Sequence, residues 1–183
     1  MKELSLNILD IAENSIKAGA KLTQILIDEK DNWLTLSIID DGCGMSEETV
    51  RSVTDPFYTT RTTRSVGLGI PLLKLACEQT GGTLSITSKE AGVCDDHGTS
   101  VVATFDKLHL DFTPLGDVVS TIVTLIQGHP DDDFLFVHTY PGGEAKLDTR
   151  ELRTVLEDVP LCSFEVLQWI RGYLEEQYNS SNN

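Results

Sequence analysis

The chain has 183 residues and a net charge of −15, from 14 basic and 29 acidic residues, and 40% of its residues are hydrophobic. This length fits one ordinary domain, or one domain with a small addition, and the apolar fraction is enough for a folded core. No run approaches the roughly 20 apolar residues of a membrane span, and the N-terminal residues lack the apolar stretch of a signal peptide. A soluble cytoplasmic protein is therefore expected.

The acidic charge is spread along the chain. Residues 1–106 hold 9 basic and 16 acidic residues, and residues 107–183 hold 5 and 13. A negative field disfavours nucleic acid and anionic membranes as partners. Any phosphate ligand would need a local site built from backbone amides, a metal ion or a few basic side chains. The four cysteines form no C-x-x-C pair, so reduced thiols are expected.

Hydrophobic periodicity predicts an amphipathic helix over residues 3–18, with Asn7, Asp10, Asn14 and Lys17 on a separate polar stripe. Two strands joined by a turn are expected at 22–28 and 33–39, followed by a glycine loop and a helix start at Ser46. A polar loop is expected at 55–66, a second long helix at about 70–80, and two more strands at 83–88 and 99–106.

The last third of the chain has signals of its own. They predict a helix of about 114–127 opened by Thr113-Pro114, a strand at 134–139 and a turn at 141–143. A short helix follows from Asp148 to Pro160, with a capping-box-like start, and a last amphipathic helix spans 164–178 ahead of the C-terminal tail. We divide the chain into a domain of residues 1–106 and a small α/β extension of residues 107–183. The extension either packs against the first domain or docks a partner.

Two of four short motifs lie in the first 45 residues. Asp10 and Asn14 are one helical turn apart, and such a pair can hold a divalent ion and a water, although two polar residues on a helix are usually just a solvated face. Asp40-Asp41-Gly42-Cys43-Gly44 follows an apolar strand. A carboxylate there can accept a hydrogen bond from an exocyclic amine, and glycines let the backbone approach a flat ring. An ordinary tight turn is the alternative.

The other two motifs follow later. Gly67-Leu68-Gly69 opens a helix, where free amides attract phosphate. Arg61 and Arg64 in the preceding loop can reach a terminal phosphate, and exposed loop charge is the alternative. Gly98-Thr99 begins a strand, where a hydroxyl can touch a base directly or through water.

The order of these four motifs resembles the GHKL ATP-binding family, which comprises gyrase B, the heat-shock ATPase chaperones, sensor histidine kinases and MutL. The stretch LDIAENSIKAGA (residues 9–20) is very like the first motif of MutL, and DPFYTTR followed by GLGI is closer to sensor histidine kinases. The resemblance covers roughly residues 3–106.

The resemblance implies a two-layer α/β sandwich of the Bergerat type, in which helices cover one face of a mixed, mostly antiparallel sheet. It implies ATP or ADP with Mg²⁺ as cofactors, Asn14 as the magnesium ligand and Asp40 as the partner of the adenine amine. It also implies that residues 55–66 form a lid over the nucleotide. The full set of implied nucleotide-binding residues is Asn14, Asp40, Gly42, Gly44, Met45, Arg61, Arg64, Gly67, Leu68, Gly69 and Thr99.

Two positions depart from the pattern of the family. Asp10, the implied catalytic residue, stands where the hydrolytic members carry Glu, and histidine kinases often carry Asn there. Ser65 replaces the usual first glycine of the lid hinge, which affects the lid geometry rather than the binding site.

The expected function is that of a Mg·ATP-binding regulatory protein, either an ATPase switch or a protein kinase acting in trans. The alternative is a nucleotide-sensing module with little or no turnover. The sequence shows no phosphoacceptor His on a helix ahead of the first motif, so self-phosphorylation is not expected. The expected partner is a regulatory or client protein, with a homodimer as a further option. The intact motifs argue against an inactive scaffold.

Overall fold

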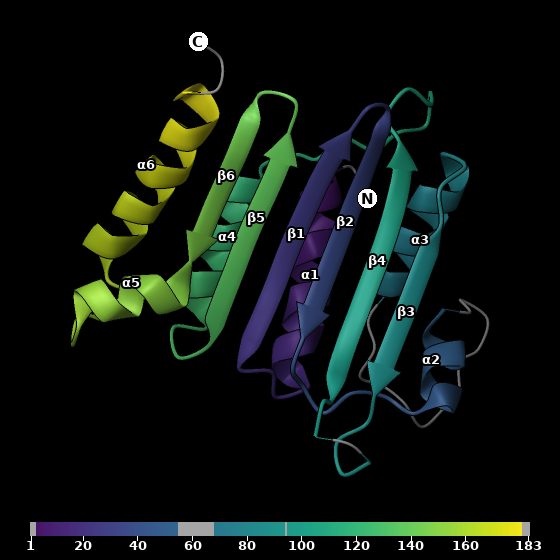
Figure 1. The fold of residues 1–183 in the computed structure, drawn as a ribbon, viewed down its shortest axis with the longest axis horizontal. Helices are drawn as coiled ribbons and strands as arrows, with labels where there is room; N and C mark the ends of the chain where they lie inside the picture. The colour runs from purple at the N-terminus through teal and green to yellow at the C-terminus, as the bar shows by residue number, and fades with distance from the viewer. Residues whose placement is uncertain (1–2, 55–67, 94, 181–183) are drawn as a thin grey trace.

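The computed structural model describes residues 3–54, 68–93 and 95–180, which form one six-stranded mixed sheet with helices packed on it (Figure 1). The strand order is β3-β4-β2-β1-β5-β6. In chain order the elements are α1 (Leu4–Lys17), β1 (Leu22–Lys30), β2 (Trp33–Asp40), α2 (Glu47–Val53), α3 (Gly69–Gln79), β3 (Leu84–Lys89), β4 (Gly98–Asp106), α4 (Val118–Gly128), β5 (Asp133–Tyr140), β6 (Gly143–Asp148), α5 (Thr149–Leu156) and α6 (Phe164–Ser180).

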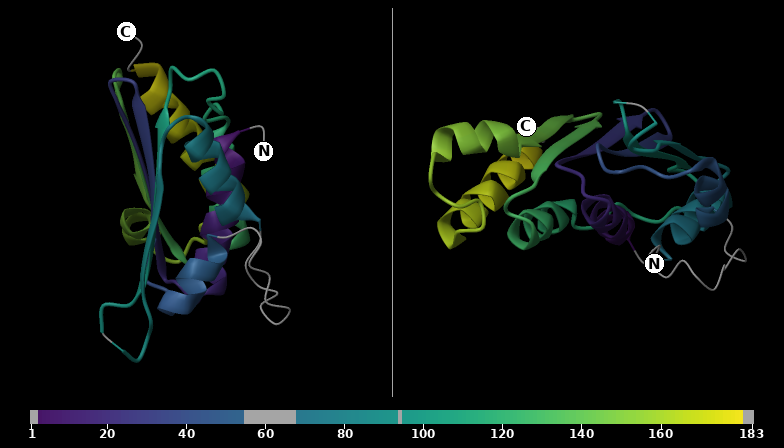
Figure 2. Two further views of the ribbon diagram at one scale, coloured as in Figure 1. Left: turned by 90° about the vertical axis from the view of Figure 1, so that its right-hand side faces the viewer. Right: turned by 90° about the horizontal axis from the view of Figure 1, so that it is seen from below.

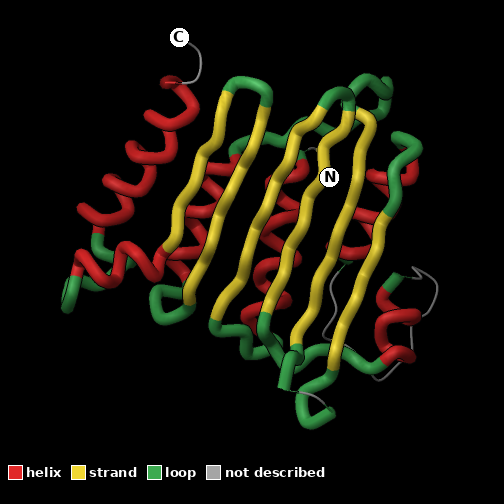
Figure 3. The backbone as a smooth tube through the Cα atoms, viewed as in Figure 1, coloured by secondary structure: helices red, strands yellow, loops and turns green. Residues whose placement is uncertain are grey.

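The sheet has one covered face and one open face. α1, α3 and α4 lie side by side behind the strands and α6 runs beyond β6, whereas α5 lies at the β6 edge on the opposite side of the sheet (Figures 2 and 3). Alternate strand residues point to the helices and are buried, so the strands show the period of two that one covered face requires. The large side chains of this core include Ile25, Leu36, Phe105, Phe134 and Phe136. The two-layer arrangement expected from the resemblance is confirmed.

The first half of the chain follows the sequence expectations closely. Strands β1 to β4 pair antiparallel, and their bounds agree with the predicted ranges within one or two residues. The predicted helix start is also confirmed, because the Ser46 hydroxyl accepts a hydrogen bond from the backbone N of Thr49 at 3.2 Å. These elements depend on local patterns, and such patterns can be read from sequence.

The expected start of the helix at Thr113-Pro114 is wrong. α4 begins at Val118, and Asp117 is its N-cap, accepting a hydrogen bond from the backbone N of Ser120 at 2.9 Å. The preceding residues have another role. The carbonyl of Pro114 accepts from the backbone N of Leu4 at 2.9 Å, and the next carbonyl accepts from Ser5. The segment before α4 therefore caps the N-terminus of α1, which has no side-chain cap of its own.

The C-terminal region continues the sheet. β5 pairs parallel with β1, with Leu22 opposite Asp133, and β6 pairs antiparallel with β5. β6 was not among the expected elements, because the sequence indicated only a turn at 141–143 before the helix at Asp148. The strand starts at the last residue of that turn and spans only six residues. The domain boundary at residue 106 stays a prediction, and one sheet contains strands from both sides of it.

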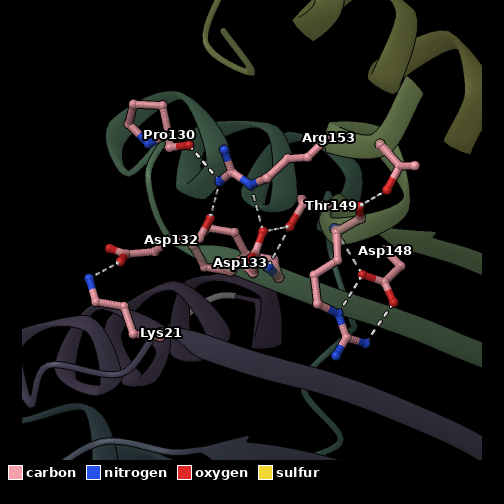
Figure 4. Close-up of polar contacts among 10 residues, drawn as sticks. Lys21, Pro130, Asp132, Asp133, Asp148, Thr149 and Arg153 are labelled. Atoms are coloured by element: carbon pink, nitrogen blue, oxygen red, sulfur yellow. Dashed lines mark hydrogen bonds and ion pairs between the residues drawn. The ribbon is translucent and has the colours of Figure 1, made fainter. Parts of the chain in front are cut away.

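A polar cluster ties α5 to the start of β5 (Figure 4). The Arg153 guanidinium donates to the Asp133 carboxylate at 2.8 Å and to the carbonyls of Pro130 and Asp132 at 2.6 and 3.0 Å. Thr149 donates to the same carboxylate at 2.9 Å. The α5 N-cap at Asp148 is as expected, although its carboxylate accepts from Arg150 and not from Glu151.

Three of the four cysteines lie in the described part of the chain, and all three are free thiols. Cys77 is buried under the sheet, and its burial raises the pKa of the thiol to about 11. It therefore behaves as a small apolar core residue. Among the described helices, none combines the length and the apolar character that crossing a bilayer demands.

Candidate functional site

A cavity of about 300 Å³ opens where α1 passes the ends of β2 and β4. Figure 1 shows that β2 finishes and β4 starts at the same end of the sheet, the end nearer to α2. The cavity brings together residues that are far apart in the sequence. Among the described residues, its lining includes Ile11, Asn14, Ser15, Lys17, Ala18, Asp40, Cys43, Gly44, Met45, Thr49, Ile70, Thr99 and Val101.

Asp40, the last residue of β2, is held in a fixed orientation. Its Oδ1 accepts from the backbone N of Gly42 at 2.9 Å and from that of Thr99 at 3.3 Å. Its Oδ2 accepts from the Ser15 hydroxyl at 2.7 Å. An ionised carboxylate has about four acceptor positions, so these three donors leave room for one more. Asp40 lines the cavity, and a ligand with an N–H group can use that position.

The glycine loop after β2 needs glycine at one position in particular. Gly44 has a φ of +70°, and a Cβ there would lie 1.9 Å from the carbonyl O of Lys89. The same loop is tied to its surroundings by backbone hydrogen bonds, because Cys43 donates to Ala18 and accepts from Ala91. The chain thus passes β3 at a distance that only glycine allows.

Gly98, at the start of β4, is in similarly close contact with the end of β2. Its φ is +132°, and a Cβ there would lie 2.0 Å from the carbonyl O of Asp40. This approach places the following residue, Thr99, beside Asp40. The Thr99 hydroxyl is 2.9 Å from that of Ser88, which in turn accepts from the backbone N of Met45 at 2.8 Å. Connected hydrogen bonds therefore join β4, β3 and the glycine loop beside the cavity.

Asp10 lies beside the cavity rather than in its lining. It is exposed on α1, one turn before Asn14. A Cβ added at Gly69 would lie 3.0 Å from the Asp10 Cβ, so α3 begins in contact with α1. The free amides at that helix start are thus close to the carboxylate. Leu68, the residue before, is 71% exposed.

The structure brings five of the expected residues into one cavity, namely Asn14, Asp40, Gly44, Met45 and Thr99. Gly42 is bonded to Asp40, and Gly69 packs on Asp10. Arg61, Arg64, Gly67 and the lid at 55–66 lie outside the described residues. The roles of all these residues stay predictions.

Sequence reasoning missed several contributors. Ser15 orients Asp40 across a separation of 25 residues, and His97 contacts the glycine loop through an Nδ1 to Gly42 O distance of 2.6 Å. The position of Ser15 next to Asn14 is the only sequence signal for its role. Lys17, which the helical wheel placed on the polar stripe with Asn14, supplies a basic group to the cavity lining. Its positive charge is opposite in sign to that of Asp40, which lines the same cavity.

Asn14 is the lining residue best suited to a hard cation, because it offers an amide oxygen without adding charge. In the described part of the chain there is no cluster of three His, Cys, Asp or Glu side chains able to hold a metal.

The chain is similar in sequence to parts of sensor kinases. The chain is 29% identical over 114 residues to a putative sensor histidine kinase NtrY-like of Rickettsia prowazekii, which is 60% of this chain and 18% of that protein. It is 30% identical over 97 residues to the sensor protein KdpD of Clostridium acetobutylicum, covering 50% of this chain and 11% of that protein. The chain thus spans less than a fifth of the length of these curated relatives.

Solved structures with a similar fold match a longer part of this chain than the sequence relatives do. The MutL ATPase domain of Aquifex aeolicus complexed with ADP is 17% identical with a TM-score of 0.54, and it covers 86% of this chain and 70% of that one. The N-terminal domain of a DNA repair protein gives a TM-score of 0.58 at 16% identity, covering 81% and 53%. The family profile described as histidine kinase-, DNA gyrase B-, and HSP90-like ATPase matches residues 2–109, which is more than half of the chain. The chain therefore belongs to this family of ATPases, as its motif order predicted.

Proposed function

We propose that this protein binds Mg·ATP in the cavity between α1, β2 and β4 and acts as an ATP-dependent regulatory protein. Either it hydrolyses ATP as a switch, or it transfers phosphate to another protein. Family membership supports ATP as the ligand, and ADP is the ligand named for the MutL ATPase domain of similar fold. The distribution of acidic charge supports a protein, and not a nucleic acid, as the downstream partner.

The observation that carries the proposal is the orientation of Asp40. Three donors from α1, the glycine loop and β4 fix its carboxylate and leave one acceptor position. We assign that position to the exocyclic amine of adenine. Gly42 and Gly44 let the backbone approach the ring, and Met45, Ile70 and Val101 supply apolar surface in the same cavity.

The phosphates would be met by local groups. Asn14 would hold Mg²⁺, which when bound neutralises phosphate charge and fixes the geometry of the phosphoryl group. Lys17 and the amides at the start of α3, with Leu68 and Gly69, would add positive potential. Arg61, Arg64 and Gly67 are assigned to the same task by the motif alone.

The first test is Asp40→Asn. The Asn oxygen can still accept from Gly42 and Thr99, and its NH₂ can donate to Ser15, so the fold is kept while the acceptor for adenine becomes a donor. ATP affinity is expected to fall by about 1.5–3 kcal/mol, or about 10- to 150-fold, in calorimetric titration with Mg·ATP.

Asp41→Asn is the matched control. It removes the same charge one residue away, at a side chain whose Oδ1 accepts from the backbone N atoms of Lys21 and Leu22 and which does not line the cavity. ATP affinity should change little in this variant. Equal affinities in Asp40→Asn and in the wild type would rule out the assigned site.

A variant of Asp10 distinguishes hydrolysis from sensing. If Asp10 orients or deprotonates water, steady phosphate release from Mg·ATP should fall at least tenfold in Asp10→Asn, while ATP binding persists. Tight binding without release in the wild type would favour the second candidate function, a nucleotide-sensing module. This second candidate is favoured by the side chain of Asp10, which is one methylene shorter than the Glu of the hydrolytic family members.

A further inference from the structure

The outer helix of the molecule carries an exposed aromatic pair. Trp169 and Tyr173 lie one turn apart on α6, with ring centroids 4.9 Å apart and nearly parallel planes. Their side chains are 52% and 39% exposed. The buried face of the same helix uses other residues, including Ile170 and Leu174, to pack on α4 and β6. The aromatic pair is therefore not needed for the attachment of α6 to the sheet.

Gly172 lies between these two rings in the sequence. Glycine within a helix costs about 1 kcal/mol relative to alanine. Nothing lies within 4 Å of a Cβ added at Gly172, so no contact within the molecule requires a glycine. Its lack of a side chain leaves an open notch on the solvent side of α6, beside Trp169. Close approach by another molecule is a physical reason for accepting this cost.

Acidic side chains border the aromatic pair. Glu165 precedes Trp169 by four residues and Glu176 follows Tyr173 by three, which places both on the same side of the helix. Both are exposed. All basic residues between 149 and 180 are already engaged with acidic partners, namely Arg150 with Asp148, Arg153 with Asp133, and Arg171 with Glu175.

We propose that this α6 strip, made of Glu165, Trp169, Gly172, Tyr173 and Glu176, binds a basic amphipathic segment of another protein. An apolar side chain of the partner packs into the notch at Gly172 against the rings, and Lys or Arg residues pair with the two glutamates. A second copy of this chain is a poor occupant, because it would bring the same two glutamates to the interface. The interaction does not depend on nucleotide binding.

The test uses the only two tryptophans of the chain. In Trp33→Phe, Trp169 becomes the sole reporter. The probe is a 14-residue helical peptide of Leu and Lys, compared with a peptide in which Ser replaces Leu and one in which Glu replaces Lys. The Leu/Lys peptide should shift the Trp169 emission to shorter wavelength and bind at least tenfold tighter than either comparison peptide.

Variants locate the binding. With a fluorescein-labelled Leu/Lys peptide, Trp169→Ala and Gly172→Gln should each lower the affinity at least tenfold in anisotropy titrations. Gly172→Gln is expected to stabilise the helix, so its loss of binding cannot come from unfolding. Trp33→Ala is the control, since Trp33 is 45% exposed on another element.

Two results would overturn the proposal. One is equal peptide affinity in Trp169→Ala and Trp33→Ala, which would show that general charge attraction binds the probe. The other is a concentration-dependent dimer in sedimentation that Trp169→Ala abolishes, which would assign the strip to a second copy of this chain.

Discussion

Gly19 and Gly44 show how the surroundings of a residue set the cost of the same substitution. Both have a left-handed backbone, with φ of +78° and +70°. Nothing lies within 4 Å of a Cβ at Gly19, whereas at Gly44 the carbonyl O of Lys89 is 1.9 Å away. The two sites therefore share the conformational cost of a side chain, and only Gly44 adds a collision with the strand backbone.

We expect Gly44→Ala to lower the free energy of unfolding by about 1–2 kcal/mol more than Gly19→Ala, because overpacking adds to the conformational cost. Gly44→Ala should also weaken ATP binding, since the glycine loop must move away from β3. Urea unfolding and ATP titration of both variants measure this. Similar losses in the two would mean that the close approach to Lys89 has no energetic consequence.

His138 is a buried titratable side chain outside the cavity, and it joins three elements. Its Nε2 is 2.9 Å from the Glu29 carboxylate on β1, and its Nδ1 is 2.8 Å from the Tyr178 hydroxyl on α6. Lys107 pairs with the other oxygen of Glu29 at 3.0 Å. Burial lowers the pKa of His138, with Glu29 acting in the opposite direction. Burial acts to raise the pKa of Glu29, but hydrogen bonds from Lys107 and His138 bring it below the ordinary value.

These shifts predict a stability that falls in mild acid. The unfolded chain takes up a proton at this histidine below pH 6.5, while the folded chain resists it. The contribution is thus complete above pH 6.5 and is lost as the pH falls through the lowered pKa. Urea unfolding at pH 7.5 and 5.5 should show a smaller loss of stability in His138→Gln than in the wild type. Glu29 acts only below its unfolded pKa of 4.5, outside this window.

At the scale of single elements, α6 protects an edge of the sheet. β6 is the last strand, so one side of its backbone has no neighbouring strand. The Gln177 side chain accepts from the backbone N of Lys146 at 2.9 Å and donates to the carbonyl of the same residue at 3.1 Å. One side-chain amide therefore takes the place of a neighbouring strand at this position.

We expect Gln177→Leu to cost about 1 kcal/mol of stability and to promote association through the exposed edge. Gln168→Leu is the matched control on the same helix, where the side chain is exposed. Urea unfolding and light scattering at increasing concentration give the two readouts. Indistinguishable behaviour of the variants would show that the edge needs no cover at Lys146.

At the scale of the whole molecule, the C-terminal region supports the elements that carry the candidate site. Besides the pairing of β5 with β1, the Thr121 hydroxyl donates to the carbonyl of Ser5 on α1 at 3.3 Å. Lys21, which directly precedes β1, forms an ion pair with Asp132 at 3.1 Å (Figure 4). The backbone N of Lys21 donates to Asp41 in the glycine loop. Contacts from the last third of the chain thus reach α1 directly and the glycine loop only through Lys21.

A fragment of residues 1–106 is therefore expected to fold poorly. It would expose the edge of β1 and the side of α1 that packs on α4, and it would leave the N-terminus of α1 without its caps. Circular dichroism, urea unfolding and ATP titration should show loss of cooperative unfolding and of binding, whereas a chain ending at residue 180 should behave as the full protein. A fragment 1–106 that unfolds cooperatively and binds ATP normally would establish it as an independent domain.

Most of the fold could be predicted from sequence wherever a local pattern carries it. The alternation in β1, β2 and β4 and the cap at Ser46 each depend on residues within one element. The polar stripe of α1 was predicted only in part, because Asn7, which was expected on it, is buried. β6 escaped prediction because its six residues start within the Pro-Gly-Gly turn, at Gly143, and its pairing with β5 is the strongest reason for it to be a strand. The start of α4 was misplaced because Pro114 and Leu115 use their carbonyls on a helix more than 100 residues away.

The sequence by itself determined the family, since four short motifs in a fixed order need no knowledge of distances. It also predicted a set of residues for a nucleotide site, from Asn14 to Thr99, and their roles stay a proposal. Only the tertiary structure decided which partners hold Asp40, because Ser15 and Thr99 are 25 and 59 residues away from it along the chain. It also decided that the last third of the chain extends the same sheet, because parallel pairing of β1 with β5 is a long-range contact that leaves no pattern in either segment alone.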